Sequence, residues 1–141
     1  MNWIRDSYTI SDEPERLQLE VIVAYLSRAY WSNQRPRAVI EKSLRHSLCF
    51  GVYENQTQIG FARAVSDHAT FAYLADVFIL ESHQGYGLGK WLVQTILAHP
   101  DLLGLRRWML ATRDAHGLYA QYGFAALENP DRYMTKFDPT A

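Results

Sequence analysis

The chain has 141 residues, with 14 Lys or Arg, 15 Asp or Glu and a net charge of -1. This length is typical of one domain, which we expect to span residues 1–141. The charge balance offers no general attraction to nucleic acid or to an anionic membrane, so neither is expected as a partner. The start of the chain lacks the apolar core of a signal peptide, and no apolar run is long enough to cross a membrane, which predicts a cytoplasmic protein.

The first part of the chain predicts a short strand near residues 8–10, followed by two helices. Asp12, with Glu15 three residues later, marks the start of the first helix, and Pro14 is tolerated in its first turn. Pro36 opens the second helix. Apolar residues form two stripes on the first helix, so we expect it to be covered on more than one side.

Residues 48–53 and 59–65 read as two strands around the polar turn 54–57, which predicts an antiparallel hairpin. The only cysteine, Cys49, lies in the first of these strands between two large apolar residues. A cysteine in that setting is typically a small buried apolar residue and not a nucleophile. A single cysteine also excludes an internal disulfide and a cysteine-rich zinc site, and no metal is expected.

Residues 71–80 are apolar at odd and even positions alike, which predicts a central strand buried on both faces. Asp76 is the one acid in this strand. A glycine-rich turn at residues 84–90 follows, and a helical pattern begins at residue 91. Glycines let a backbone approach a ligand closely, and the amides of a first helical turn point at it, so this segment predicts a site for a phosphate-bearing ligand.

Two common phosphate-binding motifs do not fit the spacing of this turn. The dinucleotide fingerprint needs glycine where the chain has Lys90. A Walker A loop needs glycine at the position of Gln84, and Ser or Thr at the position of Trp91. Neither a Rossmann site nor a P-loop is therefore expected.

The last third of the chain predicts a strand at 107–112 and a helix at 115–122 that ends at Gly123. Two more strands are expected, one near residue 124 and one at 132–137. The complete order of predicted elements is β-α-α-β-β-β-α-β-α-β-β.

Two motifs resemble those of one enzyme family. Gln84-x-x-Gly87-x-Gly89 resembles the pyrophosphate-binding signature of the GCN5-related N-acetyltransferases, which is Arg or Gln, two residues, Gly, one residue, then Gly or Ala. Ala115-x-x-Leu118-Tyr119-x-x-Tyr122-Gly123-Phe124 is similar to the closing segment of that family. The motifs stand in the family's order, and the predicted elements follow the order of its fold.

The resemblance implies an α/β fold, in which a central mixed twisted sheet of six to seven strands is flanked by about four helices. It also implies an acetyl-CoA-dependent N-acetyltransferase, an enzyme in which the amine attacks the thioester directly in a ternary complex. No covalent enzyme intermediate is needed, so the protein's task is positioning and charge placement.

The resemblance places acetyl-CoA along the central strand and the glycine turn. The main chain of Val77, Phe78 and Ile79 would run beside the pantetheine arm, with an amide near the thioester oxygen to stabilise the developing oxyanion. The pyrophosphate would lie on the turn, formed by Gln84, Gly85, Tyr86, Gly87, Leu88, Gly89 and Lys90. Within it, Lys90 would add a charge and Gln84 would brace the backbone. An ordinary tight loop is the alternative interpretation of these glycines.

The resemblance implies that Tyr119 is the general acid that protonates the departing CoA thiolate, a role suited to a phenol with a pKa of about 10. The alternative is a buried aromatic side chain. Asp76 is the candidate general base, because burial between apolar neighbours would raise its pKa. The alternative for Asp76 is a carboxylate that hydrogen-bonds backbone amides where the strand bulges, and His116 is a second candidate base.

One position departs from the family pattern. Many relatives have an asparagine that contacts the cofactor seven residues before the tyrosine, and this chain has Thr112 there. A hydroxyl replaces only part of that contact. Arg113 and Asp114 follow, and we expect them to shape the acceptor side.

The segments expected to bind the acceptor are rich in aromatic residues. These aromatic residues are Tyr25, Tyr30, Trp31, Phe71 and Tyr73. These rings would form an apolar pocket that also attracts an ammonium group, or they belong to the core. A pocket predicts a small amine or an amino acid with an apolar or aromatic side chain as acceptor, and Arg45 or Arg113 would pair with its carboxylate.

Other functions remain open at this point. A non-catalytic acyl-CoA-binding regulatory module would keep the glycine turn without needing Tyr119 or Asp76 in position. A protein N-terminal or lysine acetyltransferase would take a larger acceptor, whereas a transfer-RNA-modifying enzyme is disfavoured by the lack of basic excess. Homodimers are common among proteins that this chain resembles, so a homodimer is compatible with each of these functions.

Overall fold

The computed structural model describes residues 1–141, which form two compact units, residues 1–111 and residues 112–141. The first unit is built on one six-stranded sheet whose strands follow one another in chain order. The strands are β1 (Asn2–Arg5), β2 (Tyr8–Ser11), β3 (Leu48–Glu54), β4 (Thr57–Ser66), β5 (Phe71–Ile79) and β6 (Arg107–Met109). All neighbouring strands are antiparallel except β5 and β6, which are parallel.

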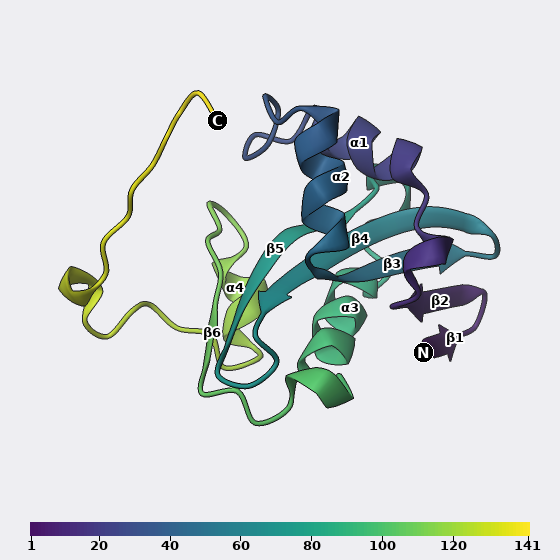
Figure 1. Ribbon diagram of the computed structural model, residues 1–141. Coiled ribbons are helices and arrows are strands. Elements are labelled where there is room, and N and C mark those ends of the chain that lie inside the picture. The colour runs from purple at the N-terminus through teal and green to yellow at the C-terminus, as the bar shows by residue number, and fades with distance from the viewer. The chain divides into compact units, whose positions relative to one another are not determined.

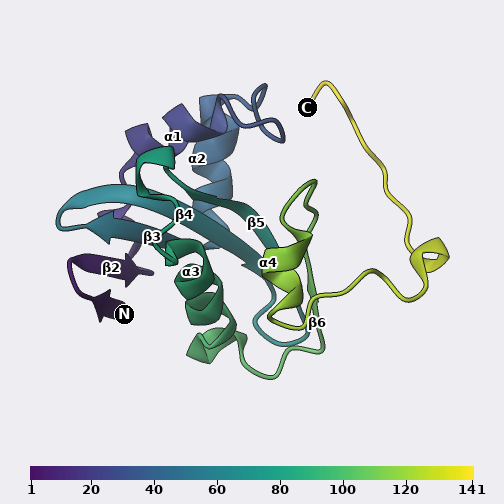
Figure 2. The ribbon, with the colours of Figure 1, turned by 180° about the vertical axis from the view of Figure 1, so that it is seen from behind.

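Helices cover both faces of this sheet. The α-helices of the first unit are α1 (Leu19–Leu26), α2 (Arg37–Arg45) and α3 (Leu88–Leu97), and its short 3-10 helices are η1 (Pro14–Arg16), η2 (Glu81–His83) and η3 (Pro100–Leu102). Helices α1 and α2 lie on one face of the sheet and α3 lies on the other (Figures 1 and 2). The mixed α/β fold expected for this chain is therefore confirmed. No helix combines the length and apolarity that crossing a membrane requires.

The core beneath α1 and α2 contains the single cysteine. The buried residues of this core come from both helices and from β3, β4 and β5. They are Ile22, Leu26, Ile40, Cys49, Phe61 and Phe78. Burial raises the pKa of the Cys49 thiol to about 12. Cys49 is thus the buried apolar residue that the sequence predicts.

The predicted start of the first helix at Asp12 is wrong. The chain forms η1 after Asp12, and α1 begins only at Leu19. Asp12 is unavailable as a helix cap because its Oδ2 is 2.7 Å from Nε2 of the buried His99. By contrast, Pro36 precedes α2 as predicted, and β3 and β4 form the predicted hairpin.

Strand β5 contains a bulge at Asp76. Phe61 of β4 lies opposite Phe78 of β5 and Arg63 lies opposite Ala75, so two steps along β4 match three along β5. Asp76 has a φ of 55°, in the left-handed region that aspartate tolerates better than most residues. The extra residue lies where β5 is paired with β4 on one side and has no strand partner on the other.

The expectation that β5 is buried on both faces is wrong for its first half. Phe71 and Tyr73 are exposed, whereas Ala72 and Leu74 between them are buried. The helical residues of the core cluster pack against Phe78, towards the other end of the strand. From Ala75 to Ile79 every residue is buried or half-buried, so only that end of the strand comes near the burial on both faces that its apolar sequence predicts.

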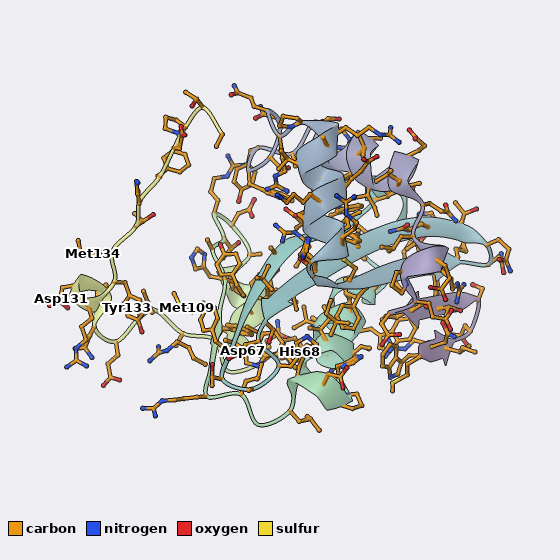
Figure 3. All side chains as sticks on the ribbon, in the orientation of Figure 1. Asp67, His68, Met109, Asp131, Tyr133 and Met134 are labelled. Carbon is orange, nitrogen blue, oxygen red and sulfur yellow. The ribbon has the colours of Figure 1, made fainter.

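The second unit contains α4 (His116–Ala120) and the 3-10 helix η4 (Pro130–Arg132), and no strand. The strands predicted near residue 124 and at 132–137 are absent, and the strand predicted at 107–112 ends at Met109. A strand needs a backbone partner, and no residue after Met109 pairs with the sheet. Apolar side chains of this segment are exposed instead, with Met134 98% exposed (Figure 3).

Candidate active site

Gln84 attaches the glycine turn between β5 and α3 to the end of β5. Its Nε2 donates a hydrogen bond of 2.9 Å to the carbonyl oxygen of Ile79, the last residue of β5. Gly85 and Gly87 follow with φ of 88° and 77°, a left-handed conformation that L side chains rarely adopt. Gln84 therefore makes the bracing contact expected of it, and two of the three glycines are required by backbone conformation.

The first turn of α3 has three backbone amides without a partner in the helix. Gly87 is its N-cap residue, no side chain caps it, and the amide of Trp91 is the first to bond back, 3.1 Å from the carbonyl oxygen of Gly87. The amides of Leu88, Gly89 and Lys90 have no carbonyl four residues before them in the helix. They form the positive end of the helix dipole, beside glycines that leave room for an anion to approach the backbone.

Gly89 is the informative glycine of the turn. Its φ is not in the left-handed region, and a Cβ added there meets no protein atom within 4 Å. Neither backbone conformation nor internal packing therefore requires glycine at this position, in the first turn of a helix where glycine is unfavourable. An ordinary tight loop leaves Gly89 unexplained, whereas a ligand lying against the helix end favours a small residue there.

The outer edge of β5 is unpaired next to this turn. Strand β6 pairs only with Phe71, Ala72 and Tyr73, and β4 occupies the opposite edge. From Leu74 to Ile79, the edge that faces away from β4 has no strand partner. An extended ligand arm can lie on such an edge as a peptide does in strand addition. This edge includes Val77, Phe78 and Ile79 and leads into the glycine turn.

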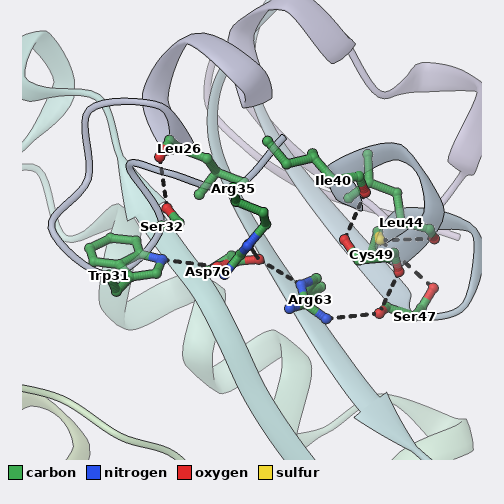
Figure 4. A network of polar contacts seen from close by, with 11 residues as sticks. Leu26, Trp31, Ser32, Arg35, Ile40, Leu44, Ser47, Cys49, Arg63 and Asp76 are labelled. Atoms are coloured by element: carbon green, nitrogen blue, oxygen red, sulfur yellow. Dashed lines mark hydrogen bonds and ion pairs between the residues drawn. The ribbon is translucent and has the colours of Figure 1, made fainter. Parts of the chain in front are cut away.

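Asp76 lies in a cluster of polar side chains on the α1 and α2 face of the sheet (Figure 4). Its Oδ2 accepts hydrogen bonds from Arg63 Nε at 2.6 Å and from Arg35 Nη1 at 2.9 Å, and its Oδ1 accepts one from Trp31 Nε1 at 2.9 Å. Arg63 also donates through Nη1 to Ser47 Oγ at 3.2 Å. The carboxylate thus ties the bulge of β5 to β4 and to the segment between α1 and α2.

The expected rise in the pKa of Asp76 is wrong. Burial is the largest influence and would raise this pKa, but the hydrogen bond and charge of Arg63, the charge of Arg35 and the hydrogen bond of Trp31 together hold it below its ordinary value. Asp76 does lie at a bulge, as its alternative interpretation has it, but its partners are side chains and not backbone amides. The proposal that Asp76 is the general base depended on a raised pKa, and the pKa of Asp76 is lowered.

Some of the predicted acceptor aromatics are brought together. The Tyr25 ring stacks on Phe78 with centroids 3.9 Å apart, and the Arg28 guanidinium lies 4.4 Å from the Tyr25 centroid. Tyr30 meets Trp31 edge to face at 5.1 Å. Tyr25 is thereby engaged in packing, whereas Tyr30 and Trp31 are 48% and 38% exposed.

Other predicted site residues belong to the second unit. Tyr119 is buried, and its ring meets Phe124 edge to face at 5.8 Å. Thr112 Oγ1 accepts a hydrogen bond of 3.0 Å from the amide of Ala115, just before α4 begins. Arg113 and His116 are exposed.

Comparison with known proteins shows the family of the chain. A model of the acetyltransferase (GNAT) family matches residues 2–124. The chain belongs to this family. Its members take their acetyl group from acetyl-CoA, so this GNAT protein is an acyltransferase by family.

Relatives of this GNAT acetyltransferase cover most of its length. FG08082 of Gibberella zeae, described as a candidate acetyltransferase, is 35% identical over 143 residues, which cover 85% of this chain and 80% of that protein. A solved GNAT-family protein of Xanthomonas campestris pv. campestris is 45% identical, with a TM-score of 0.91 and 94% of each chain covered. N-acetylglutamate synthase of Neisseria gonorrhoeae, solved with coenzyme A and N-acetyl-glutamate, shares the fold at a TM-score of 0.71 and 15% identity, over 88% of this chain and 30% of that one.

Sequence reasoning on this GNAT acetyltransferase missed two arginines. Arg35 and Arg63 lie 41 and 13 residues from Asp76 and meet it only through the tertiary structure. The one available signal was the position of Arg63 in an otherwise apolar stretch of a predicted strand. A charge there needs a partner, and Asp76 is the one acid in the adjacent predicted strand.

Proposed function

We propose that the protein is an acetyl-CoA-dependent N-acetyltransferase that acts on a primary amine by direct attack in a ternary complex. The observation that carries this proposal is the continuity of two open features: the unpaired edge of β5 and the glycine-lined N-terminus of α3. An extended arm ending in a pyrophosphate has the shape and charge that this surface accepts. Acetyl-CoA has both parts and supplies the activated acetyl group.

The residues of the turn have separate tasks in this proposal. The amides of Leu88, Gly89 and Lys90 bind the pyrophosphate, and the exposed Lys90 side chain adds a positive charge. Gln84 keeps the turn attached to β5 through its bond to Ile79. The backbone edge at Val77, Phe78 and Ile79 orients the pantetheine arm, and an amide of this edge stabilises negative charge on the thioester oxygen.

Proton transfer is assigned to different groups. Tyr119 donates a proton to the departing thiolate, supported by the similarity of residues 115–124 to the family's closing segment. Asp76 is held ionised by two arginines and is a weak base, so the amine loses its proton to water. Asp76 then serves to position the β5 bulge beside the reacting edge.

The acceptor is a small amine or amino acid. The exposed rings of Tyr30 and Trp31 offer an apolar surface beside Asp76. The N-acetylglutamate synthase that shares this fold was solved with an acetylated amino acid, which is consistent with an acceptor of that size.

One experiment tests the proposal directly. The protein is titrated with acetyl-CoA and with CoA by calorimetry, and thiol release is then followed over a panel of amines. Binding with thiol release is the expected result. Binding without release from any small amine or peptide would favour the non-catalytic acyl-CoA-binding module, and absence of binding would overturn the site.

A further inference from the structure

The cluster around Asp76 holds more positive than negative charge. Arg35 and Arg63 both donate to one oxygen of Asp76, and their side chains are 22% and 14% exposed, against 2% for Asp76. The ion pairs of the cluster thus set two guanidiniums against one carboxylate. One positive charge remains uncompensated within it, on side chains that still reach solvent.

These guanidiniums have donors that Asp76 does not use. A guanidinium carries five N–H groups. Side-chain hydrogen bonds engage Nη1 of Arg35, and Nε and Nη1 of Arg63. The only buried side-chain nitrogen or oxygen without a partner is the Tyr53 hydroxyl, so the guanidinium nitrogens that make no bond are accessible to solvent. A fork of N–H donors with unbalanced charge fits a second carboxylate.

Aromatic surface borders this charge. Trp31 binds Asp76 through its Nε1, and its ring is 38% exposed and meets the half-exposed ring of Tyr30. Tyr73, 37% exposed, pairs with Val65, two residues along β4 from Arg63. An apolar group attached to the carboxylate would therefore find rings beside the two arginines.

We infer that the acceptor is an α-amino acid with an apolar or aromatic side chain, and that Arg35 and Arg63 receive its carboxylate. The inference rests on the proposed function, which places the thioester on the edge that begins at Val77. Asp76 is the residue before Val77, so the arginines that bind Asp76 lie beside the stretch of β5 that contains the reacting edge. The amine and carboxylate of an α-amino acid share one carbon, so an α-amino acid suits a carboxylate site and a reacting edge on the same stretch of strand.

The test compares acceptors that differ only in the carboxylate. L-phenylalanine is paired with phenethylamine and L-leucine with isoamylamine, and kcat/KM is measured by thiol release. We expect the amino acids to be preferred by about tenfold or more, since hydrogen bonds to charged groups are stronger than neutral ones. Arg35→Gln should remove most of this preference by slowing the amino acids alone. Arg37→Gln is the control, because Arg37 pairs with Glu20 and Glu41 on the surface.

Each outcome bears on the inference. Wild-type protein that acetylates phenethylamine as efficiently as L-phenylalanine overturns it while leaving N-acetyl transfer intact. If Arg35→Gln lowers kcat/KM equally for L-phenylalanine and phenethylamine, Arg35 has a structural role only, and the inference is also overturned.

If no amine releases thiol, N-acetyl transfer fails and the carboxylate site is measured alone. The protein is then titrated with 3-phenylpropionate and with its neutral amide, 3-phenylpropionamide, in the presence of CoA. Preference for the carboxylate that is lost in Arg35→Gln supports the subsite. Equal binding, or none, overturns it.

Discussion

At the scale of one residue, two substitutions of Gly89 distinguish its effect on CoA binding from its effect on stability. Gly89→Ala meets no protein atom and relieves an unfavourable helical glycine, so it should raise the free energy of unfolding by about 0.5–1 kcal/mol. CoA affinity should persist, because the family signature accepts alanine there. Gly89→Val places a branched side chain over the helix end and should weaken CoA binding by about tenfold or more, which is 1.4 kcal/mol or more. Calorimetric titration and urea unfolding measure the two quantities, and unchanged CoA affinity in Gly89→Val would sink the phosphate site.

The proposed role of Tyr119 depends on one group, its hydroxyl. Tyr119→Phe removes only the hydroxyl, so CoA affinity should be unchanged while kcat falls by about 10²–10⁴-fold, the range of general acid catalysis. Tyr122→Phe is the matched control, three residues along the same segment. If turnover in Tyr119→Phe equals that of the wild type, the proton comes from solvent or another donor.

Asp76 acts at the scale of elements, because it joins β5 to β4 and to the segment between α1 and α2. Asp76→Asn leaves two partly buried arginines without a counter-charge. Breaking a fully buried pair costs about 3–5 kcal/mol, and since both arginines reach solvent we expect a loss of about 1–3 kcal/mol in the free energy of unfolding. Chemical denaturation at pH 7 measures it.

The pH dependence of that loss follows from the lowered pKa of Asp76. A carboxyl whose folded pKa lies below its unfolded value of about 3.9 stabilises the fold fully above that value, and the stabilisation is lost as the pH falls through the folded pKa. The difference between wild type and Asp76→Asn should therefore be constant from pH 7 to about pH 5 and shrink below about pH 4. A difference that stays constant down to pH 3 would contradict the ionised cluster.

The elements that the sequence predicted correctly are those with local signals. Pro36 opens α2, and a polar turn joins β3 to β4, because both depend on residues that are neighbours in the chain. The start of α1 was missed because Asp12 binds His99, 87 residues away. The strands predicted after Gly123 are absent, because an apolar stretch cannot show whether a partner strand exists for it.

Across the whole molecule, the features of the candidate site also divide into those set by neighbouring residues and those set by long-range contacts. The glycine turn is a contiguous motif, so its position and the bracing contact of Gln84 were predictable from the sequence. The pKa of Asp76 was not, because its sign is set by two arginines that only the packing of α1, α2 and β4 brings to it. Burial alone predicts a rise, and the long-range partners reverse it.

Cys49 reports on the stability of the whole molecule. It is the only cysteine, it lies in the buried core beneath α1 and α2, and its thiol has a pKa of about 12. Because the thiolate is the reactive form, iodoacetamide should alkylate it only when the fold opens. Acetyl-CoA has no free thiol to consume the reagent, and at 100 times its Kd it should slow labelling about 100-fold, since a ligand of the folded state reduces opening by that factor. Labelling followed by mass spectrometry measures the rate, and Gly89→Val should lose the protection. If acetyl-CoA does not change the wild-type rate and calorimetry also detects no binding, the folded protein has no site for it. An unchanged rate with calorimetric binding would mean that Cys49 is labelled through a local opening that keeps the site.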